Sequence, residues 1–317
     1  DRSPSRGLGD VYKRQGPATV VLAGTASGME SSVYAVVAIA IAIGVSLALG
    51  GGNLTFSLYL VALCGMGMLA TTGVIVSEDT FGPVSDNAGG IAEMAELPKE
   101  VRQVTDSLDS LGNTTAAVAK GFAIGSAAIT ALALFKAFEQ ASGLEAIDIG
   151  DVEVTMGLFV GAMVPFVFAA LTMQSVGRAA QKMIVEVRRQ FAEIPGLREG
   201  RAGVKPDYAR CVDISTAAAL KEMVLPGALA IILPLGIGLL SVKALGGFLA
   251  GALVTGFLLA IYMANAGGAW DNAKKYIEAG NQGGKGSDAH KAAVIGDTVG
   301  CLLYTSPSPR DGLLSRM

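Results

Sequence analysis

Six apolar stretches, each long enough to cross a lipid bilayer, constrain the fold of this 317-residue chain. A helix needs about 17–25 mostly apolar residues to span the hydrocarbon core, and its backbone groups must hydrogen-bond within the segment. Only 16% of the residues are charged, against about 25% in a typical soluble domain. The sequence therefore predicts an all-α, polytopic transmembrane helix bundle, with about six full spans and the start of a seventh helix near Asp288. The expected spans are Val33–Leu49, Thr55–Val76, Ala116–Phe135, Val154–Val176, Met223–Val242 and Leu245–Asn265.

Positive charge is concentrated in one polar connection between the expected spans, Gly177–Lys221. By the positive-inside rule, this connection lies on the cytoplasmic side of the membrane. Because successive spans alternate in direction, two further polar connections, Ser77–Asn113 and Trp270–Lys291, are expected on the same side. Every unusual cluster of charged residues is thus predicted to face the cytoplasm, where phosphorylated substrates are abundant.

A carboxylate and two lysines follow directly after the last expected span. Asp271, Lys274 and Lys275 stand at positions i, i+3 and i+4, which share one face of a helix. Charges this close to lipid are costly and indicate a functional site. Carboxylates can hold Mg²⁺ and ammonium groups can bind phosphate oxygens, so the pattern favours phosphoryl transfer at the membrane surface. An interfacial tryptophan belt with snorkelling lysines would explain Trp270 and the lysines, but not Asp271.

Two other polar clusters are expected at the same membrane face. Asp79 and Asp86 are seven residues apart, about two helical turns, and project from one face if the second span continues as a helix. Asn113, Ala116 and Lys120 also share a face, and a lysine inside a span needs a polar partner. Taken singly, a solvated helix end or a helix cap explains each cluster. Their convergence favours a common site.

Several other kinds of site are excluded by the residue inventory. His290 is the single histidine, which argues against a histidine-based metal site and a Ser-His-Asp triad. The Gly284–Ser287 run lacks both the spacing and the preceding strand of a P-loop. The three cysteines are too irregularly spaced for a disulfide framework. No nucleic-acid partner is expected.

Both ends of the chain look unlike the rest. Residues 1–15 and 301–317 are polar, lack helical periodicity, and each carries Ser-Pro-Ser followed by arginine within two residues. Neither has the apolar region of a signal peptide. We expect both to be non-native flanks around a native stretch, 16–300; native but disordered tails are the alternative.

The runs between these ends resemble the membrane-integral pyrophosphatases, a family of pyrophosphate-energised proton or sodium pumps. The resemblance covers nearly all of residues 16–300, in the family's order. It implies the C-terminal part of a sixteen-helix subunit, from about the tenth helix to the start of the sixteenth, in a homodimer. The matching runs are Phe81–Met94, Gly112–Ala127, Val187–Gly196, Cys211–Gly227, Gly267–Gly280 and Asp288–Gly300.

The resemblance also implies roles for individual residues. Pyrophosphate would sit among Mg²⁺ ions in a funnel open to the cytoplasm, in a prokaryotic cell membrane. Asn113 would contact the metal–pyrophosphate complex, and Lys274 and Lys275 would line the phosphate site. The Mg²⁺ ligands would be Asp86, Asp271 and Asp297, with Asp79 just outside them.

One position bears on potassium. K⁺-independent members of the family carry lysine where this chain has Ala116, so the resemblance implies activation by K⁺. Three residues later, Ala119 stands where glycine is expected.

The resemblance also shows what the chain lacks. The family continues with Asp-Pro after Gly300, whereas this chain turns to Cys301, and the helices carrying half of the water-activating carboxylate pair and the ion gate are absent. We therefore expect the chain alone to be inactive, and the sequence does not distinguish H⁺ from Na⁺ as the pumped ion. A secondary transporter or channel, with the acidic clusters as ion sites and no hydrolysis, is the alternative function. A purely structural membrane protein would leave the converging charges unexplained.

Overall fold

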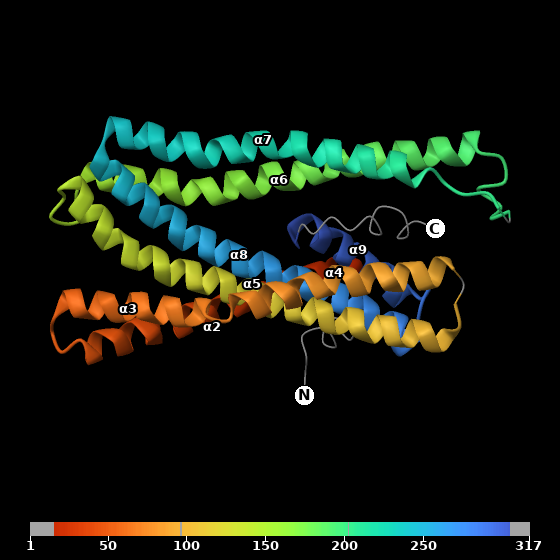
Figure 1. Ribbon diagram of the computed structural model, residues 1–317, viewed down its shortest axis with the longest axis horizontal. Helices are drawn as coiled ribbons and strands as arrows, with labels where there is room; N and C mark the ends of the chain where they lie inside the picture. The colour runs from red at the N-terminus through yellow and green to blue at the C-terminus, as the bar shows by residue number, and fades with distance from the viewer. Residues whose placement is uncertain (1–15, 96, 202, 305–317) are drawn as a thin grey trace.

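A computed structural model describes residues 16–95, 97–201 and 203–304 of the chain. These residues form long α-helices joined by short connections, with no β-strand in the described ranges (Figure 1). The prediction of an all-α helix bundle is therefore confirmed. The elements are α2 (Pro17–Leu49), α3 (Leu54–Leu69), α4 (Thr72–Met94), α5 (Lys99–Ser142), α6 (Val152–Glu193), α7 (Tyr208–Leu240), α8 (Val242–Glu278), the short 3₁₀ helix η1 (Asn281–Gly283) and α9 (Asp288–Tyr304).

Five stretches of the described helices are long and apolar enough to cross a membrane: α2, α6, α7, α8 and the Gly121–Ser142 part of α5. The remaining expected span, Thr55–Val76, is divided between α3 and α4, whose axes are bent by 42° relative to one another. At this break the Thr72 hydroxyl donates a hydrogen bond to the Leu69 carbonyl at 2.6 Å. Such back-bonding by threonine bends helices, and it gives a physical reason for a break inside an apolar stretch.

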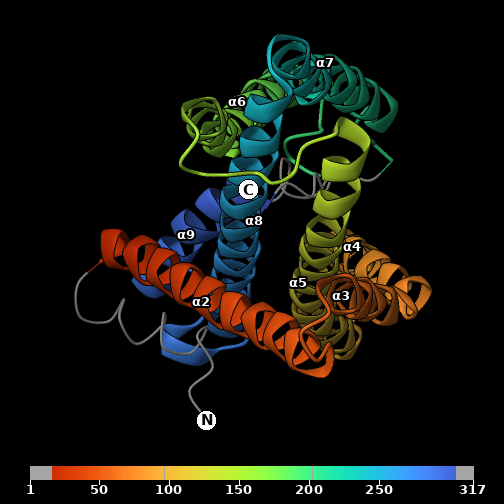
Figure 2. The same cartoon turned by 90° about the vertical axis from the view of Figure 1, so that its left-hand side faces the viewer.

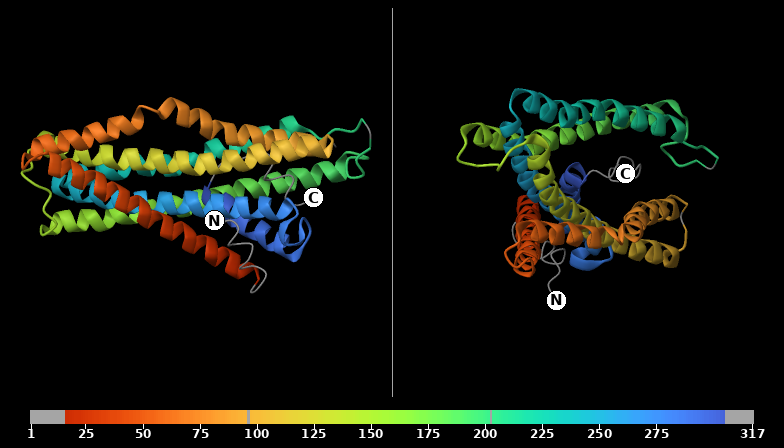
Figure 3. Two further views of the ribbon diagram at one scale, coloured as in Figure 1. Left: turned by 90° about the horizontal axis from the view of Figure 1, so that it is seen from below. Right: turned by 60° about the vertical axis from the view of Figure 1, so that its left-hand side comes forward.

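The helices are longer than the spans predicted within them. α6 has 42 residues and α5 has 44, whereas about 20 residues suffice to cross the hydrocarbon core. Much of the polar sequence between expected spans is therefore helical and extends the apolar segments beyond the membrane. α4 and α5 lie side by side over this extension (Figure 3).

Helix α8 lies at the centre of the bundle. It packs against α6 and α7 toward one end, and against α2, α9 and α5 elsewhere (Figure 2). Its closest neighbour is α6, because glycines on both helices remove the side chains between them. A Cβ on Gly157 or Gly161 of α6 would overlap a backbone carbonyl oxygen of α8, and Gly247 and Gly251 of α8 are placed in the same way against α6. Small residues allow this close backbone approach in membrane helices.

Trp270 anchors α8 to α2 and α9. Its side chain is 1% exposed, and its indole Nε1 donates a hydrogen bond to the Val20 carbonyl of α2 at 3.0 Å. Gly24 on α2 and Gly296 on α9 leave the space that the ring fills. Trp270 is therefore a core residue, which removes the reason to interpret it as part of an interfacial tryptophan belt.

The flanks expected to be non-native lie mostly outside the described residues. Residues 1–15 and 305–317 belong to this undescribed part, so their interpretation stays a prediction. Residues 301–304 continue helix α9.

Candidate functional site

The charged residues expected after the last span lie on the final turns of α8. This helix runs without a break from Val242 to Glu278, so it carries the charged residues on the same rigid rod as the apolar span. The Lys275 ammonium is 2.9 Å from Asp271 Oδ2, and the Lys274 ammonium is 3.5 Å from Asp271 Oδ1. The i, i+3, i+4 spacing thus places Asp271 between both lysines, as predicted.

Helix α9 adds a second carboxylate. Asp297 Oδ2 lies 2.5 Å from the Lys274 ammonium, and the side chain of Asp297 is largely buried. The approach of α9 depends on Gly296 and Gly300, which pack against the Trp270 ring of α8. The structure therefore brings Lys274, Asp271 and Asp297 together, as the family resemblance implies.

A third carboxylate comes from α5 and was missed by the sequence analysis. Asp109 Oδ2 lies 2.8 Å from the Lys275 ammonium, and Asp109 is only 2% exposed. It stands four residues before Asn113 on a continuous helix, about one turn away. That spacing was an available signal, but only the packing of α5 against α8 shows which lysine Asp109 meets.

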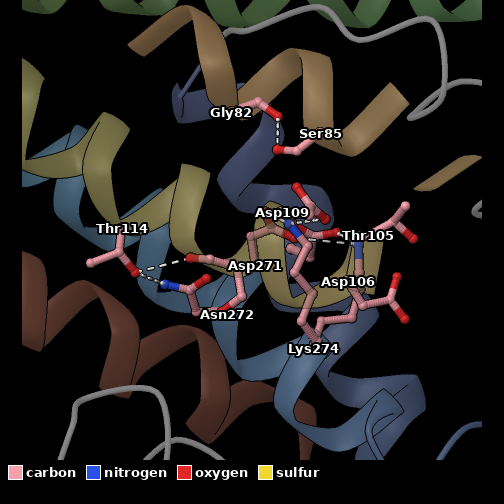
Figure 4. Close-up of polar contacts among 12 residues, drawn as sticks. Gly82, Ser85, Thr105, Asp106, Asp109, Thr114, Asp271, Asn272 and Lys274 are labelled. Carbon is pink, nitrogen blue, oxygen red and sulfur yellow. Dashed lines mark hydrogen bonds and ion pairs between the residues drawn. The ribbon is translucent and has the colours of Figure 1, made fainter. Parts of the chain in front are cut away.

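We call these five residues the charge cluster: Asp109, Asp271, Lys274, Lys275 and Asp297. Asp109, Asp271 and Lys274 are labelled in Figure 4. The five residues come from three helices and carry three carboxylates against two ammonium groups. Their ion pairs are largely shielded from solvent, where electrostatic interactions are stronger than at an exposed surface. The cluster is therefore a preformed polar site at the end of an apolar bundle.

Burial disfavours the charged form of two carboxylates in the cluster, and neighbouring carboxylates add to the effect. Burial raises the pKa of Asp109 to about 6; the Lys275 ammonium opposes this shift, and the carboxylates of Asp86 and Asp271 add to it. Burial also raises the pKa of Asp297, with the Asp271 carboxylate adding and Lys274 opposing. The neighbouring lysines thus offset only part of what burial costs the charged forms of Asp109 and Asp297.

Asp86 approaches the cluster from α4. The helices α4 and α5 come close where a Cβ on Gly112 would lie 2.5 Å from Gly82 Cα. The buried Ser85 hydroxyl donates to the Gly82 carbonyl at 2.8 Å in this contact (Figure 4). The resulting proximity allows Asp86 to influence the pKa of Asp109.

Other expected site residues lie on α4 and α5. The side chains of Asp79, Asn113, Ala116 and Lys120 fall outside the described part of the structure, so their predicted roles stay predictions. Ala119 is buried on α5. On α5, the Thr114 hydroxyl accepts a hydrogen bond from the Asn272 amide of α8 at 3.4 Å (Figure 4). This bond joins α5 and α8 beside the charge cluster.

The carboxylates of the candidate site are suitable Mg²⁺ ligands, but they do not form a closed cage around a metal ion. Within the described ranges, no three Asp, Glu, His or Cys side chains surround a single point as ligands of one ion would. The carboxylates of the charge cluster are held by lysines. Mg²⁺ commonly binds through one or two carboxylates, substrate phosphates and water, without an all-protein cage. Asp86, Asp271 and Asp297 suit a metal that binds together with a phosphate ligand.

Membrane-length helices with lysines and carboxylates gathered at one end define an integral membrane protein with a site for charged ligands. Comparison with known sequences identifies the family: the model for "Inorganic H+ pyrophosphatase" matches residues 4–303. The chain belongs to this family, which confirms the resemblance noted from its motifs.

Two relatives show the range within the family. A protein of Clostridium tetani, whose name describes a K(+)-stimulated pyrophosphate-energized sodium pump, is 59% identical over 305 residues, covering 95% of this chain and 45% of the relative. A protein of Methanosarcina mazei, named a K(+)-insensitive pyrophosphate-energized proton pump, is 52% identical over 304 residues, covering 94% of this chain and 45% of the relative. The chain thus spans about half the length of these relatives.

Proposed function

We propose that this chain is the C-terminal part of a subunit that couples hydrolysis of magnesium pyrophosphate to transport of H⁺ or Na⁺. The observation that carries the proposal is the charge cluster, in which two lysines of α8 meet carboxylates from α5, α8 and α9. Family membership supports the same activity. The site lies on the cytoplasmic side of a prokaryotic cell membrane, in keeping with the positive charge between α6 and α7.

The lysines and the aspartates of the site have different roles, which follow from their charge. Pyrophosphate is strongly anionic, and the ammonium groups of Lys274 and Lys275 bind its phosphate oxygens in exchange for carboxylate partners. Asp86, Asp271 and Asp297 would hold Mg²⁺, with Asn113 and Asp79 beside them. A metal ion held there would supply positive charge to stabilise the leaving phosphate and to orient the attacking water.

We infer that the complete site also needs parts of the subunit outside this chain, because the chain covers 45% of each of these two relatives. Half of the water-activating carboxylate pair and the ion gate belong to the preceding part of the subunit, and the functional unit is a homodimer. The chain alone therefore neither hydrolyses pyrophosphate nor pumps ions.

A hydrolysis assay on the full-length protein containing this chain tests the proposal. We expect phosphate release from pyrophosphate that requires Mg²⁺ and is accompanied by ion uptake into reconstituted vesicles. The chain expressed alone is the matched control and should release no phosphate. A full-length protein that is folded but hydrolytically inactive would favour a transporter or channel that uses the acidic side chains as ion sites.

K⁺ is expected to stimulate this hydrolysis. Ala116 stands at the sequence position where K⁺-independent members of the family carry lysine, and the Clostridium tetani relative is named as K⁺-stimulated. Adding K⁺ at a fixed Na⁺ concentration and constant ionic strength should raise the rate, and Ala116→Lys should remove the difference. Equal rates with and without K⁺ for the unmodified protein would contradict this assignment.

A further inference from the structure

Asp109 is a buried carboxylate on a helix that otherwise contributes no charge to the described cluster. It lies within α5, its side chain is 3% exposed, and it bonds the Lys275 ammonium at 2.8 Å. Burial of an aspartate at this level is rare unless the charge is paired. The burial of Asp109 and its ion pair with Lys275 therefore indicate a specific role for this residue.

Lys275 depends on a partner from outside its own helix. A lysine side chain has four flexible carbons, so a bond to a carboxylate one turn away on α8 does not fix where its ammonium points. Asp271, that neighbour, is also in contact with Lys274. Among the described residues, Asp109 is the carboxylate from another helix that contacts Lys275. This cross-helix bond determines the direction of the Lys275 ammonium.

We propose that Asp109 is a positioning residue, which holds the Lys275 ammonium in place to receive a phosphate group of the substrate. The inference rests on the proposed function, because it assigns Asp109 a part in binding pyrophosphate at the same site. Asp109 acts through Lys275 and does not itself touch the substrate. The same bond fixes α5, which also carries Asn113, against the phosphate-binding end of α8.

Charge alone would predict the opposite effect of removing Asp109. A buried negative charge repels an anionic substrate, so its loss should tighten binding if long-range electrostatics dominated. Loss of positioning should weaken binding, because the freed ammonium must be ordered again when the substrate arrives. The sign of the change in affinity therefore separates the two effects.

The decisive experiment is a double-mutant cycle in the full-length protein, with binding of magnesium imidodiphosphate, a non-hydrolysable analogue, measured by calorimetry. Asp109→Ala should weaken binding about tenfold, in the range found for residues that orient a ligand-binding group. Asp109→Asn keeps the shape and an acceptor, and should cost about threefold, since neutral acceptors bond an ammonium about half as strongly. In a Lys275→Ala background, Asp109→Ala should have almost no further effect.

Asp106→Ala is the matched control. Asp106 lies three residues earlier on the same helix and also forms an ion pair, with Arg102 at 2.7 Å, but its side chain is 50% exposed. This substitution should leave the affinity unchanged. KM should rise with Kd in the Asp109 variants, and thermal unfolding of Asp109→Asn checks that the fold is kept.

Three results would overturn the inference: tighter binding by Asp109→Ala, an equal loss with and without Lys275, or an equal loss in the Asp106 control. An equal loss in both backgrounds would indicate a purely structural role. Failure of the proposed function itself is distinguishable, because the unmodified full-length protein would then neither bind the analogue nor hydrolyse pyrophosphate.

Discussion

Replacing Gly161 with alanine is expected to destabilise the bundle strongly. The new Cβ would overlap the carbonyl oxygen of Phe248 in α8. Because that oxygen belongs to the backbone, no side-chain rotation can relieve the overlap, and the helices must move apart. We expect a loss of about 3 kcal/mol or more in the free energy of unfolding, at or above the upper end for overpacked cores.

Gly177 provides a matched control on the same helix. A Cβ at this position would meet no atom within 4 Å. Gly177→Ala should therefore stabilise α6 by about 0.5–1 kcal/mol, through helix propensity alone. Thermal unfolding of the full-length protein in detergent measures both variants. Equal unfolding midpoints for Gly161→Ala and Gly177→Ala would show that the backbones of α6 and α8 are not in contact.

Gly161→Ala is also expected to affect the candidate site, because α8 is one continuous helix. Its N-terminal half carries Gly247 and Gly251, which face α6, and its C-terminal end carries the charged residues. Separating α6 from α8 would shift the rod that positions Lys274 and Lys275. We therefore expect Gly161→Ala to lower activity along with stability, even though the substitution is far along the helix from the charge cluster.

Properties that depend on local spacing could be predicted from the sequence. The apolar stretches indicated the helices, and the i, i+3, i+4 spacing placed Asp271 beside both lysines. The family resemblance added Asp297, whose contact with Lys274 depends on α9 packing against α8. Local patterns and motifs thus accounted for four of the five members of the charge cluster.

Properties that depend on packing between distant segments could not be predicted in this way. In the sequence, Asp109 is one acidic residue among several in a polar segment. Only the packing of α5 beside α8 shows that it contacts Lys275. The burial of Trp270 likewise depends on Gly24 and Gly296, which come from two other helices. The break between α3 and α4 escaped notice because the hydropathy of Thr55–Val76 is continuous, whereas the bend follows from side-chain hydrogen bonds to the backbone.

Asp271→Asn is expected to have the largest effect on activity. Asp271 contacts both lysines, at 2.9 and 3.5 Å, and is a proposed Mg²⁺ ligand. Asparagine has the same shape but no charge, so the substitution removes a metal ligand and leaves two ammonium groups with less compensation. We expect kcat/KM for magnesium pyrophosphate to fall about 100-fold or more, beyond the loss usual for residues that only support a metal ligand.

Asp288→Asn separates this effect from a general loss of negative charge. Asp288 begins α9 and pairs with Lys291 at 3.0 Å, but its side chain is 81% exposed. Exposed ion pairs contribute little, so this variant should keep nearly full activity. If Asp271→Asn hydrolysed pyrophosphate as fast as Asp288→Asn, the α8 cluster would not be part of the catalytic site. A large loss confined to Asp271→Asn, reduced by raised Mg²⁺ concentration, would instead place the metal at this carboxylate, because a weakened metal site can be refilled by mass action.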